Sequence, residues 1–225
     1  MKIKQAKLEF DIEDRLSLDY GRKLRGFFAN EFEDVLFHHH KENDKFRYGY
    51  PLIQYKILRG KPTVIAIGDG VSLIAENFLE IDKLTLGENE YEEPDINLSM
   101  SNWELSVKED VEMLPYKYEF ITPWMAFNQK NFDKYKSEIQ GSSDEKRVEF
   151  LSRILIGNIL SFAKSIDWWI EEEIKVIPVL KDINVNFKSM NMIGFKGFFF
   201  TNIILPEDIG LGQSSSRGFG TIKEK

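Results

Sequence analysis

The order of strand and helix patterns in residues 1–86 restricts the fold more than any other feature of this chain. The central signal is Arg59-Gly60-Lys61, a short turn between two apolar runs, which predicts a β-hairpin. Apolar residues at helical spacing lie before and after this hairpin, and alternating residues open the chain. The predicted elements are, in order, a strand at 2–11, a helix at 22–32, strands at 51–58 and 62–67, a helix at 71–81 and a strand at 84–86. This β-α-β-β-α-β order is that of a ferredoxin-like, or RRM-like, domain.

The second half of the chain shows a degenerate version of the same order. An acidic, proline-bearing stretch at 87–112 is interpreted as the connection between the halves. The elements predicted after it are a strand at 116–124, a long helix capped near Ser142–Glu145, and strands at 173–181, 183–188 and 192–205. The predicted fold class is therefore α+β, with tandem ferredoxin-like domains at residues 1–110 and 111–225 and a C-terminal glycine-rich loop.

Composition excludes several classes of protein. The 225 residues include no cysteine, which excludes disulfides and thiolate metal sites and fits a reducing cytoplasm. The basic start of the chain lacks the apolar run and the cleavage site of a signal peptide. No apolar run approaches the length of a membrane span. We therefore expect a cytoplasmic protein with no membrane partner.

The net charge of −7 is unusual for a protein that binds nucleic acid, because such proteins normally carry a basic face. The charges are unevenly spread, however. Acidic residues gather at 87–95, 104–112 and 171–173, whereas basic residues dominate Arg22–Arg25 and the end of the chain from residue 186. Two interpretations stay open: a local basic groove on an acidic body, or ordinary solvated surface charge.

Residues 210–220 form a segment of small side chains around a single arginine, Arg217. Its glycines are Gly210, Gly212, Gly218 and Gly220. We expect this loop to expose backbone N–H groups to a chain of phosphates, with Arg217 as the charge anchor. The alternative is that the glycines serve ordinary turns.

All three histidines of the protein are adjacent, at His38-His39-His40. Imidazole takes up and releases protons near neutral pH, so a histidine pair beside a phosphate-binding loop indicates a nuclease that needs no metal. In an extended segment His38 and His40 share one side, which makes them the predicted catalytic pair. A solvated loop or an adventitious metal site is the alternative, and a dedicated zinc site is disfavoured because adjacent histidines cannot all face one ion.

Several segments together resemble the CRISPR-associated endoribonuclease family that cuts precursor CRISPR RNA within its repeats. They occur in the family's order and cover nearly the whole chain. The matching segments are Lys23–Asn30, Leu36–His40, Tyr50–Lys56, Gly60–Gly68, Phe120–Trp124, Gly194–Gly197 and Gly210–Gly220. The resemblance implies two ferredoxin-like domains of the RAMP type, no cofactor, and metal-independent cleavage that leaves a 2′,3′-cyclic phosphate and a 5′-hydroxyl.

This reaction assigns roles to particular residues. The RNA 2′-hydroxyl is itself the nucleophile, so the protein supplies a base, an acid and charge stabilisation. One of His38 and His40 would deprotonate the hydroxyl, and the other would protonate the leaving oxygen. The candidates for the stabilising cation or orienting group are Lys56, Arg25, Lys23 and Tyr48. The predicted RNA-binding residues are Lys23, Arg25, Gly210, Gly212, Gln213, Ser214, Arg217, Gly218 and Gly220.

Two other functions remain as alternatives. The first is a member of the same family that binds CRISPR repeat RNA without cutting it, and the second is a ferredoxin-like protein with a small ligand or protein partner. Further CRISPR-associated effector subunits and a homodimer are open as additional partners. The aromatic runs Phe198–Phe200 and Trp168–Trp169 are interpreted as core or domain-interface residues, with base stacking as the alternative.

Overall fold

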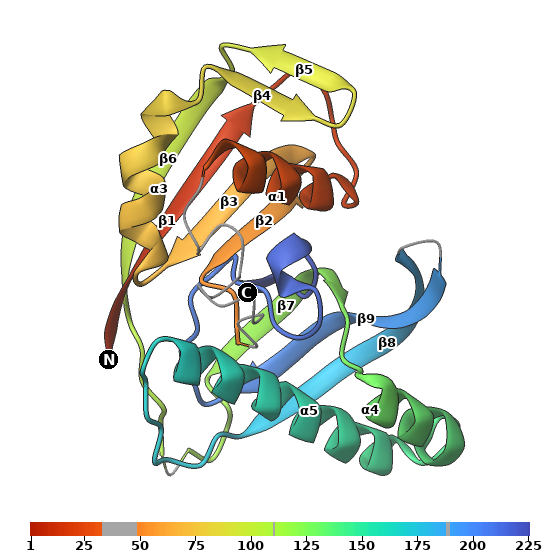
Figure 1. Ribbon diagram of the computed structural model, residues 1–225. Helices are drawn as coiled ribbons and strands as arrows, with labels where there is room; N and C mark the ends of the chain where they lie inside the picture. Colours follow the sequence, from red (N-terminus) through yellow and green to blue (C-terminus); the bar gives the residue numbers. More distant parts are fainter. Residues whose placement is uncertain (33–48, 110, 188–189) are drawn as a thin grey trace, which may run out of the picture. The chain divides into compact units, whose positions relative to one another are not determined.

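The computed structural model of the protein describes residues 1–32, 49–109, 111–187 and 190–225 (Figure 1). The chain divides into two compact units. The N-terminal unit comprises Lys2–Glu104 and a short piece from the far end of the chain, Ser216–Gly218. The C-terminal unit comprises Met1, Leu105–Ser215 and Phe219–Lys225. No helix among the described residues is both long enough and apolar enough to cross a bilayer.

The N-terminal unit is built on a four-stranded sheet in the order β2-β3-β1-β6, with all neighbours antiparallel. The strands are β1 (Lys2–Asp11), β2 (Ile53–Leu58), β3 (Lys61–Ile67) and β6 (Asp95–Glu104). Two helices, α1 (Tyr20–Glu31) and α3 (Gly70–Asn77), lie on one face of this sheet, and a short 3₁₀ turn, η1 (Phe78–Glu80), follows α3 (Figure 1). The first and third strands are central, as the ferredoxin-like fold requires, so the fold class predicted from the sequence is confirmed.

Two parts of the sequence interpretation of this unit are wrong. The predicted final strand at 84–86 becomes β4 (Lys83–Leu86), which pairs with β5 (Asn89–Glu92) in a separate two-stranded sheet. The acidic stretch 87–112 is not a plain connection, because β6 lies within it and pairs with β1 along its whole length. An edge strand can be polar because much of it faces solvent, and most side chains of β6 are exposed.

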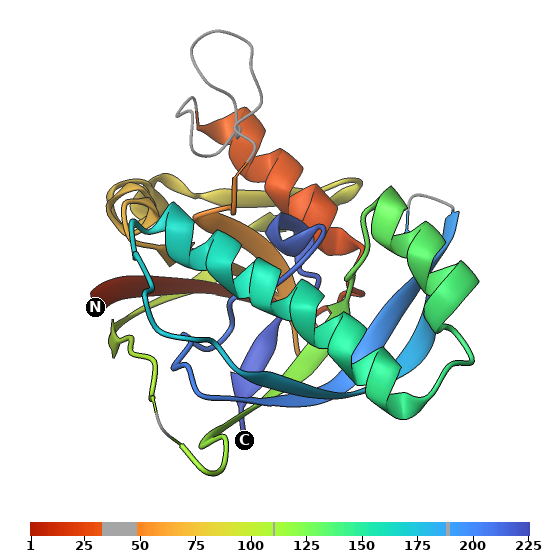
Figure 2. The ribbon, with the colours of Figure 1, turned by 90° about the horizontal axis from the view of Figure 1, so that it is seen from below.

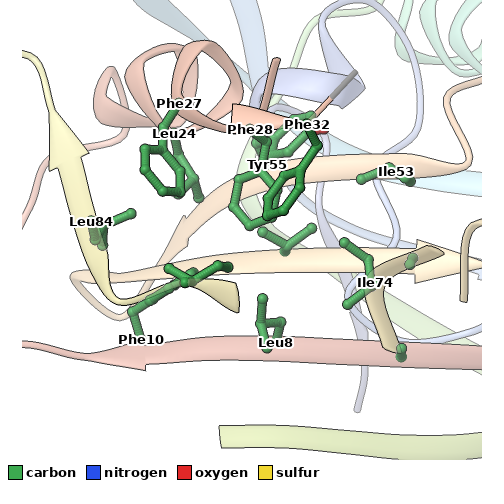
Figure 3. Close-up of a cluster of buried hydrophobic side chains, with 14 of the residues drawn as sticks. Leu8, Phe10, Leu24, Phe27, Phe28, Phe32, Ile53, Tyr55, Ile74 and Leu84 are labelled. Carbon is green, nitrogen blue, oxygen red and sulfur yellow. The ribbon is translucent and has the colours of Figure 1, made fainter. Parts of the chain in front are cut away.

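The helical spacing of apolar residues in α1 explains the core of the N-terminal unit. Leu24, Phe27 and Phe28 are buried on one side of the helix, and their side chains point to the sheet (Figure 3). The ring of Phe28 lies 5.5 Å from that of Tyr55 on β2 and 6.3 Å from that of Phe10 on β1, centroid to centroid. This packing holds α1 in place, and with it the charged side chains on the rest of its surface.

The C-terminal unit repeats the same strand order as β10-β7-β9-β8. Its strands are β7 (Tyr116–Trp124), β8 (Val176–Phe187), β9 (Met190–Thr201) and β10 (Ile222–Glu224). The helices α4 (Gln129–Lys134) and α5 (Asp144–Ser165) lie on one face, with a π-helical turn, η2 (Tyr135–Ile139), between them (Figure 2). Between β9 and β10, where the N-terminal unit has a second helix, this unit has the glycine-rich loop with one 3₁₀ turn, η3 (Ser215–Arg217).

Three details of this unit differ from the sequence prediction. The separate strands predicted at 173–181 and 183–188 form one strand, β8, while α4 and β10 were not predicted.

The long helix begins where its caps predict: the Oγ of Ser143 accepts a hydrogen bond from the N–H of Lys146, and Asp144 and Glu145 occupy the first turn. Arg147 then ties α5 to β8 by donating hydrogen bonds to the carbonyl of Leu180 and the carboxylate of Asp182.

Candidate nucleic-acid interface

Close packing explains the glycines of the C-terminal loop. At Gly220, where φ is +63°, a Cβ atom would lie 1.9 Å from the carbonyl oxygen of Leu211. At Gly212, where φ is +88°, it would lie 2.6 Å from Nε1 of Trp124. Both positions therefore exclude a side chain on grounds of space as well as backbone conformation. The loop is folded tightly onto its own unit at these two residues.

Much of the loop's backbone is already hydrogen-bonded. The N–H groups of Leu211, Gln213 and Gly220 donate to carbonyl oxygens of Gly220, Met125 and Pro123, respectively. This differs from the expected row of exposed N–H groups, because the loop takes part in its own unit's packing instead of standing free of it. The side chains of the loop remain accessible: Gln213 is exposed, and Ser214, Ser216 and Arg217 are half-buried.

The tip of the loop, Ser216–Gly218, packs within the N-terminal unit. A Cβ atom at Gly21, in the first turn of α1, would lie 2.7 Å from the carbonyl oxygen of Arg217. A Cβ atom at Gly218 would lie 3.3 Å from the Cα atom of Lys56 on β2. The absence of side chains at these two glycines thus allows the loop to approach both α1 and β2, which brings Arg217 next to two elements far from it in sequence.

Three arginines gather at this contact. Arg22 and Arg25 are three residues apart on α1 and so share one side of the helix. Burial lowers the pKa of Arg217 from its ordinary value, and the positive charges of Arg25 and Arg22 lower it further. Among the described parts of the chain, no ion pair involves any of the three. We call Arg22, Arg25 and Arg217 the arginine cluster.

An anion is the natural ligand of such a cluster. Like charges held together raise each other's free energy, and an anion at the same place removes that repulsion. The guanidinium group also donates two parallel hydrogen bonds, which match the oxygens of a phosphate. The arginine cluster therefore has the charge and the hydrogen-bond donors to bind a phosphate of nucleic acid.

The backbone of Lys56 lies against Gly218 of the loop tip, and the residue is fully buried on β2. A buried ammonium group is unusual in proteins because removal from water disfavours its charge. Its neighbour Tyr55 is also buried, which raises the pKa of its phenol above the ordinary value, while the charge of Arg25 acts in the opposite direction. The backbones of α1 and β2 thus both lie against the loop tip, at Gly21 and at Lys56 respectively.

The other predicted residues are placed differently. Lys23 does not join the arginine cluster, because its Nζ lies 3.7 Å from the ring centroid of Tyr20 and 3.1 Å from the place of a Cβ atom at Gly87. His38, His40 and Tyr48 lie outside the described residues. Arg22 is absent from the predicted contact residues, although its helical spacing from Arg25 is a signal that places both on one side. In the described ranges no three His, Asp or Glu side chains are grouped as a metal site requires.

Two family models match this chain. The model of the Cas6b N-terminal domain matches residues 1–104, and that of the Cas6b C-terminal domain matches residues 110–225. A curated relative, an uncharacterised protein from Methanocaldococcus jannaschii, is 39% identical over 107 residues, which are 47% of this chain and 70% of that protein.

Solved structures of Cas6b proteins match this chain over its full length. A crystal structure of Cas6b is 36% identical, with a TM-score of 0.88 and 100% of both chains covered. A crystal structure of the CRISPR RNA processing endoribonuclease Cas6b is 35% identical, with a TM-score of 0.76 and again 100% of both chains covered. With both of its halves matched by the family's own models, this chain belongs to the Cas6b family.

Proposed function

We propose that this chain is an endoribonuclease that cuts precursor CRISPR RNA within its repeats. Its membership of the Cas6b family supports this function, as does its 35% identity to a full-length relative described as a CRISPR RNA processing endoribonuclease. The observation that carries the proposal is the arginine cluster, in which Arg217 of the glycine-rich loop packs against the first turn of α1, the helix that carries Arg22 and Arg25. It supplies a phosphate-binding site on a chain whose net charge is −7.

The cluster holds the RNA backbone rather than reading its bases. Arginines that bind phosphates fix the position of a nucleic acid and contribute most of its salt-dependent affinity. Gln213 and Ser214 of the C-terminal unit are further candidates for RNA contact, because their side chains are accessible. The glycines Gly212, Gly218 and Gly220 act mainly by allowing the loop to pack closely, and Gly210 is kept as a candidate for RNA contact.

The proposed cleavage needs no metal ion. One histidine of the pair His38 and His40 takes the proton of the 2′-hydroxyl, and the other gives a proton to the leaving 5′-oxygen. The 2′-oxygen attacks the adjacent phosphorus, so the products are a 2′,3′-cyclic phosphate and a 5′-hydroxyl. Lys56, which is buried beside the loop tip, is the candidate for stabilising the extra negative charge of the phosphorane.

A cleavage assay in the presence of EDTA tests this mechanism. The substrate is the host's repeat RNA, alongside a copy with a 2′-deoxy sugar at the cut site. We expect the wild type to cut the RNA and leave the deoxy copy intact, and His40→Ala to bind without cutting. Cleavage of the deoxy copy, or full activity of His40→Ala, would contradict the mechanism. Tight binding without cleavage by the wild type would instead identify an RNA-binding member that lacks catalysis.

The role of the arginine cluster is tested separately, by RNA affinity. In Arg217→Ala we expect affinity to fall about tenfold at physiological salt, and the slope of log affinity against log salt to become shallower by about one. The matched control is Arg153→Ala, which removes an equal charge from an exposed arginine of α5 paired with Glu149. If both variants lose the same affinity, the effect is one of net charge and the cluster is not the phosphate site.

A further inference from the structure

The aromatic run of β9 is divided between the two faces of its sheet. Phe199 is fully buried, and its ring lies 5.6 Å from that of Tyr118 on the side covered by the helices. Phe198 and Phe200 point to the opposite face and are only half-buried. The interpretation of this run as core or interface therefore holds for Phe199, while its two neighbours need another explanation.

The face that carries these two rings is unusually apolar. Across the strand pair, Val179 lies opposite Phe198 and Ile177 lies opposite Phe200. The two β8 residues are 47% and 49% exposed, respectively. We call Phe198, Phe200, Ile177 and Val179 the open-face cluster. Such a group of accessible apolar side chains marks a binding surface more often than an isolated exposed residue does.

The residues around the cluster are cationic. The Nζ of Lys117, on β7, lies 4.2 Å from the ring centroid of Phe198 and 5.9 Å from that of Phe200. Two residues from the pair of Val179 and Phe198, Lys181 on β8 and Lys196 on β9 are directly opposite each other, and both are exposed. Glu119 on β7 lies directly opposite Phe198, and its carboxylate forms an ion pair with Lys225, whose Nζ lies 2.7 Å away. This surface thus combines flat apolar rings, which can stack on bases, with positive charges, which can bind the phosphates of a polynucleotide.

The local sequence has the form used by RNA-binding sheets. Lys196-Gly197-Phe198-Phe199-Phe200 matches four of the first five positions of the RNP1 motif, Lys/Arg-Gly-Phe/Tyr-Gly/Ala-Phe, whose aromatic residues stack bases on a four-stranded sheet. The glycine has a structural cause here: at φ +134° its Cβ atom would lie 2.3 Å from the carbonyl oxygen of Val179. The fourth position, small in that motif, is Phe199, which fills the core instead.

We propose that the open-face cluster of the C-terminal unit is a second RNA contact, in which Phe198 and Phe200 stack on unpaired bases and Lys117 binds a neighbouring phosphate. The two ring centroids are 5.5 Å apart, with an angle of 87° between the planes. The rings are therefore nearly perpendicular, and their flat faces point in different directions towards an RNA strand. Stacking is tolerant of sequence because every base has a flat face. This inference rests on the proposed RNA function and adds a region of single-stranded recognition distinct from the arginine cluster.

The test measures the affinity of the wild type and its variants for the repeat RNA with a 2′-deoxy sugar at the cut site. Phe198→Leu with Phe200→Leu keeps apolar side chains but removes both rings, so we expect binding to weaken about tenfold or more. Phe198→Tyr with Phe200→Tyr keeps the rings and should bind as the wild type does. Leu160→Ala, at an exposed apolar residue of α5, is the matched control and should leave affinity unchanged.

A second measurement does not depend on variants. Repeat RNA that contains photoreactive 5-iodouridine should cross-link to Phe198 or Phe200 of the wild type, and mass spectrometry of the peptides identifies the residue. The inference would be overturned, and the proposed function left standing, if the leucine variant bound RNA as tightly as the wild type and the wild type formed no cross-links on β9. Loss of self-association in that variant with unchanged RNA affinity would overturn it in favour of a protein interface. Failure of the wild type to bind repeat RNA at all would overturn both.

Discussion

At the scale of single residues, the glycines show how one residue type serves different purposes. Gly220 and Gly212 allow close packing that no side chain would permit. Gly157 lies in the middle of α5, and a Cβ atom there would meet open space. A glycine-rich segment indicates a phosphate-binding loop, but its glycines can also allow close packing. Only the surroundings of each glycine distinguish the two roles.

This difference yields a prediction for stability. Gly220→Ala should lower the free energy of unfolding by at least about 1–2 kcal/mol, because the residue has a left-handed backbone and its Cβ atom would clash with Leu211. Gly157→Ala, the control, should raise it by up to about 1 kcal/mol, because alanine favours a helix. Urea unfolding of both variants measures the effects. Equal stability of Gly220→Ala and the wild type would show that the loop is not packed as described.

At the scale of elements, the start of α5 is set by a local signal. Ser143 caps the helix through the N–H of Lys146. Ser143→Ala should therefore lower the free energy of unfolding by about 1 kcal/mol, since that N–H loses its acceptor. Ser143→Asp keeps an acceptor oxygen and should be close to the wild type. Thermal unfolding followed by circular dichroism compares them, and an alanine variant as stable as the aspartate variant would disprove the capping role.

The elements that the sequence indicated correctly are those with strong local patterns. The helix α1 follows from the spacing of Leu24, Phe27 and Phe28, and the hairpin of β2 and β3 follows from the turn at Gly60. The strand β6 was missed because it is polar and mostly exposed and lies in an acidic stretch that resembles a linker. Backbone groups pair β6 with β1, although the two strands are far apart in sequence. Such backbone pairing cannot be read from the types of side chain in the strand.

At the scale of the whole molecule, buried tyrosines should limit stability at high pH. Tyr118 is fully buried, and its hydroxyl donates to the carbonyl of Leu205 and accepts from the N–H of Leu205. Burial raises the pKa of Tyr118, and likewise that of Tyr55, above the ordinary value of 10.0. The fold therefore favours the neutral phenols, which ionise more readily in the unfolded chain.

The direction of the pH effect follows from these shifts. The tyrosines' contribution is complete below pH 10.0, the ordinary pKa, and is lost progressively as the pH rises from there towards the raised pKa of the folded state. We expect the free energy of unfolding to fall with pH in that window. Tyr118→Phe should be less stable at neutral pH but show a shallower alkaline decline. Urea unfolding from about pH 8 to about pH 11 measures both slopes; identical slopes would contradict this assignment.

The sequence by itself determined the order of most elements, the ferredoxin-like class and the family, because periodic apolar residues and short motifs are local properties of the chain. It also indicated Arg25 and Arg217 as binding residues. Only the tertiary structure decided that Arg22 belongs to the arginine cluster, that Lys23 contacts the ring of Tyr20 instead, and that Phe198 and Phe200 lie outside the core. These outcomes depend on which segments pack together across the chain, since burial and charge repulsion arise from neighbours in space and not from neighbours in sequence.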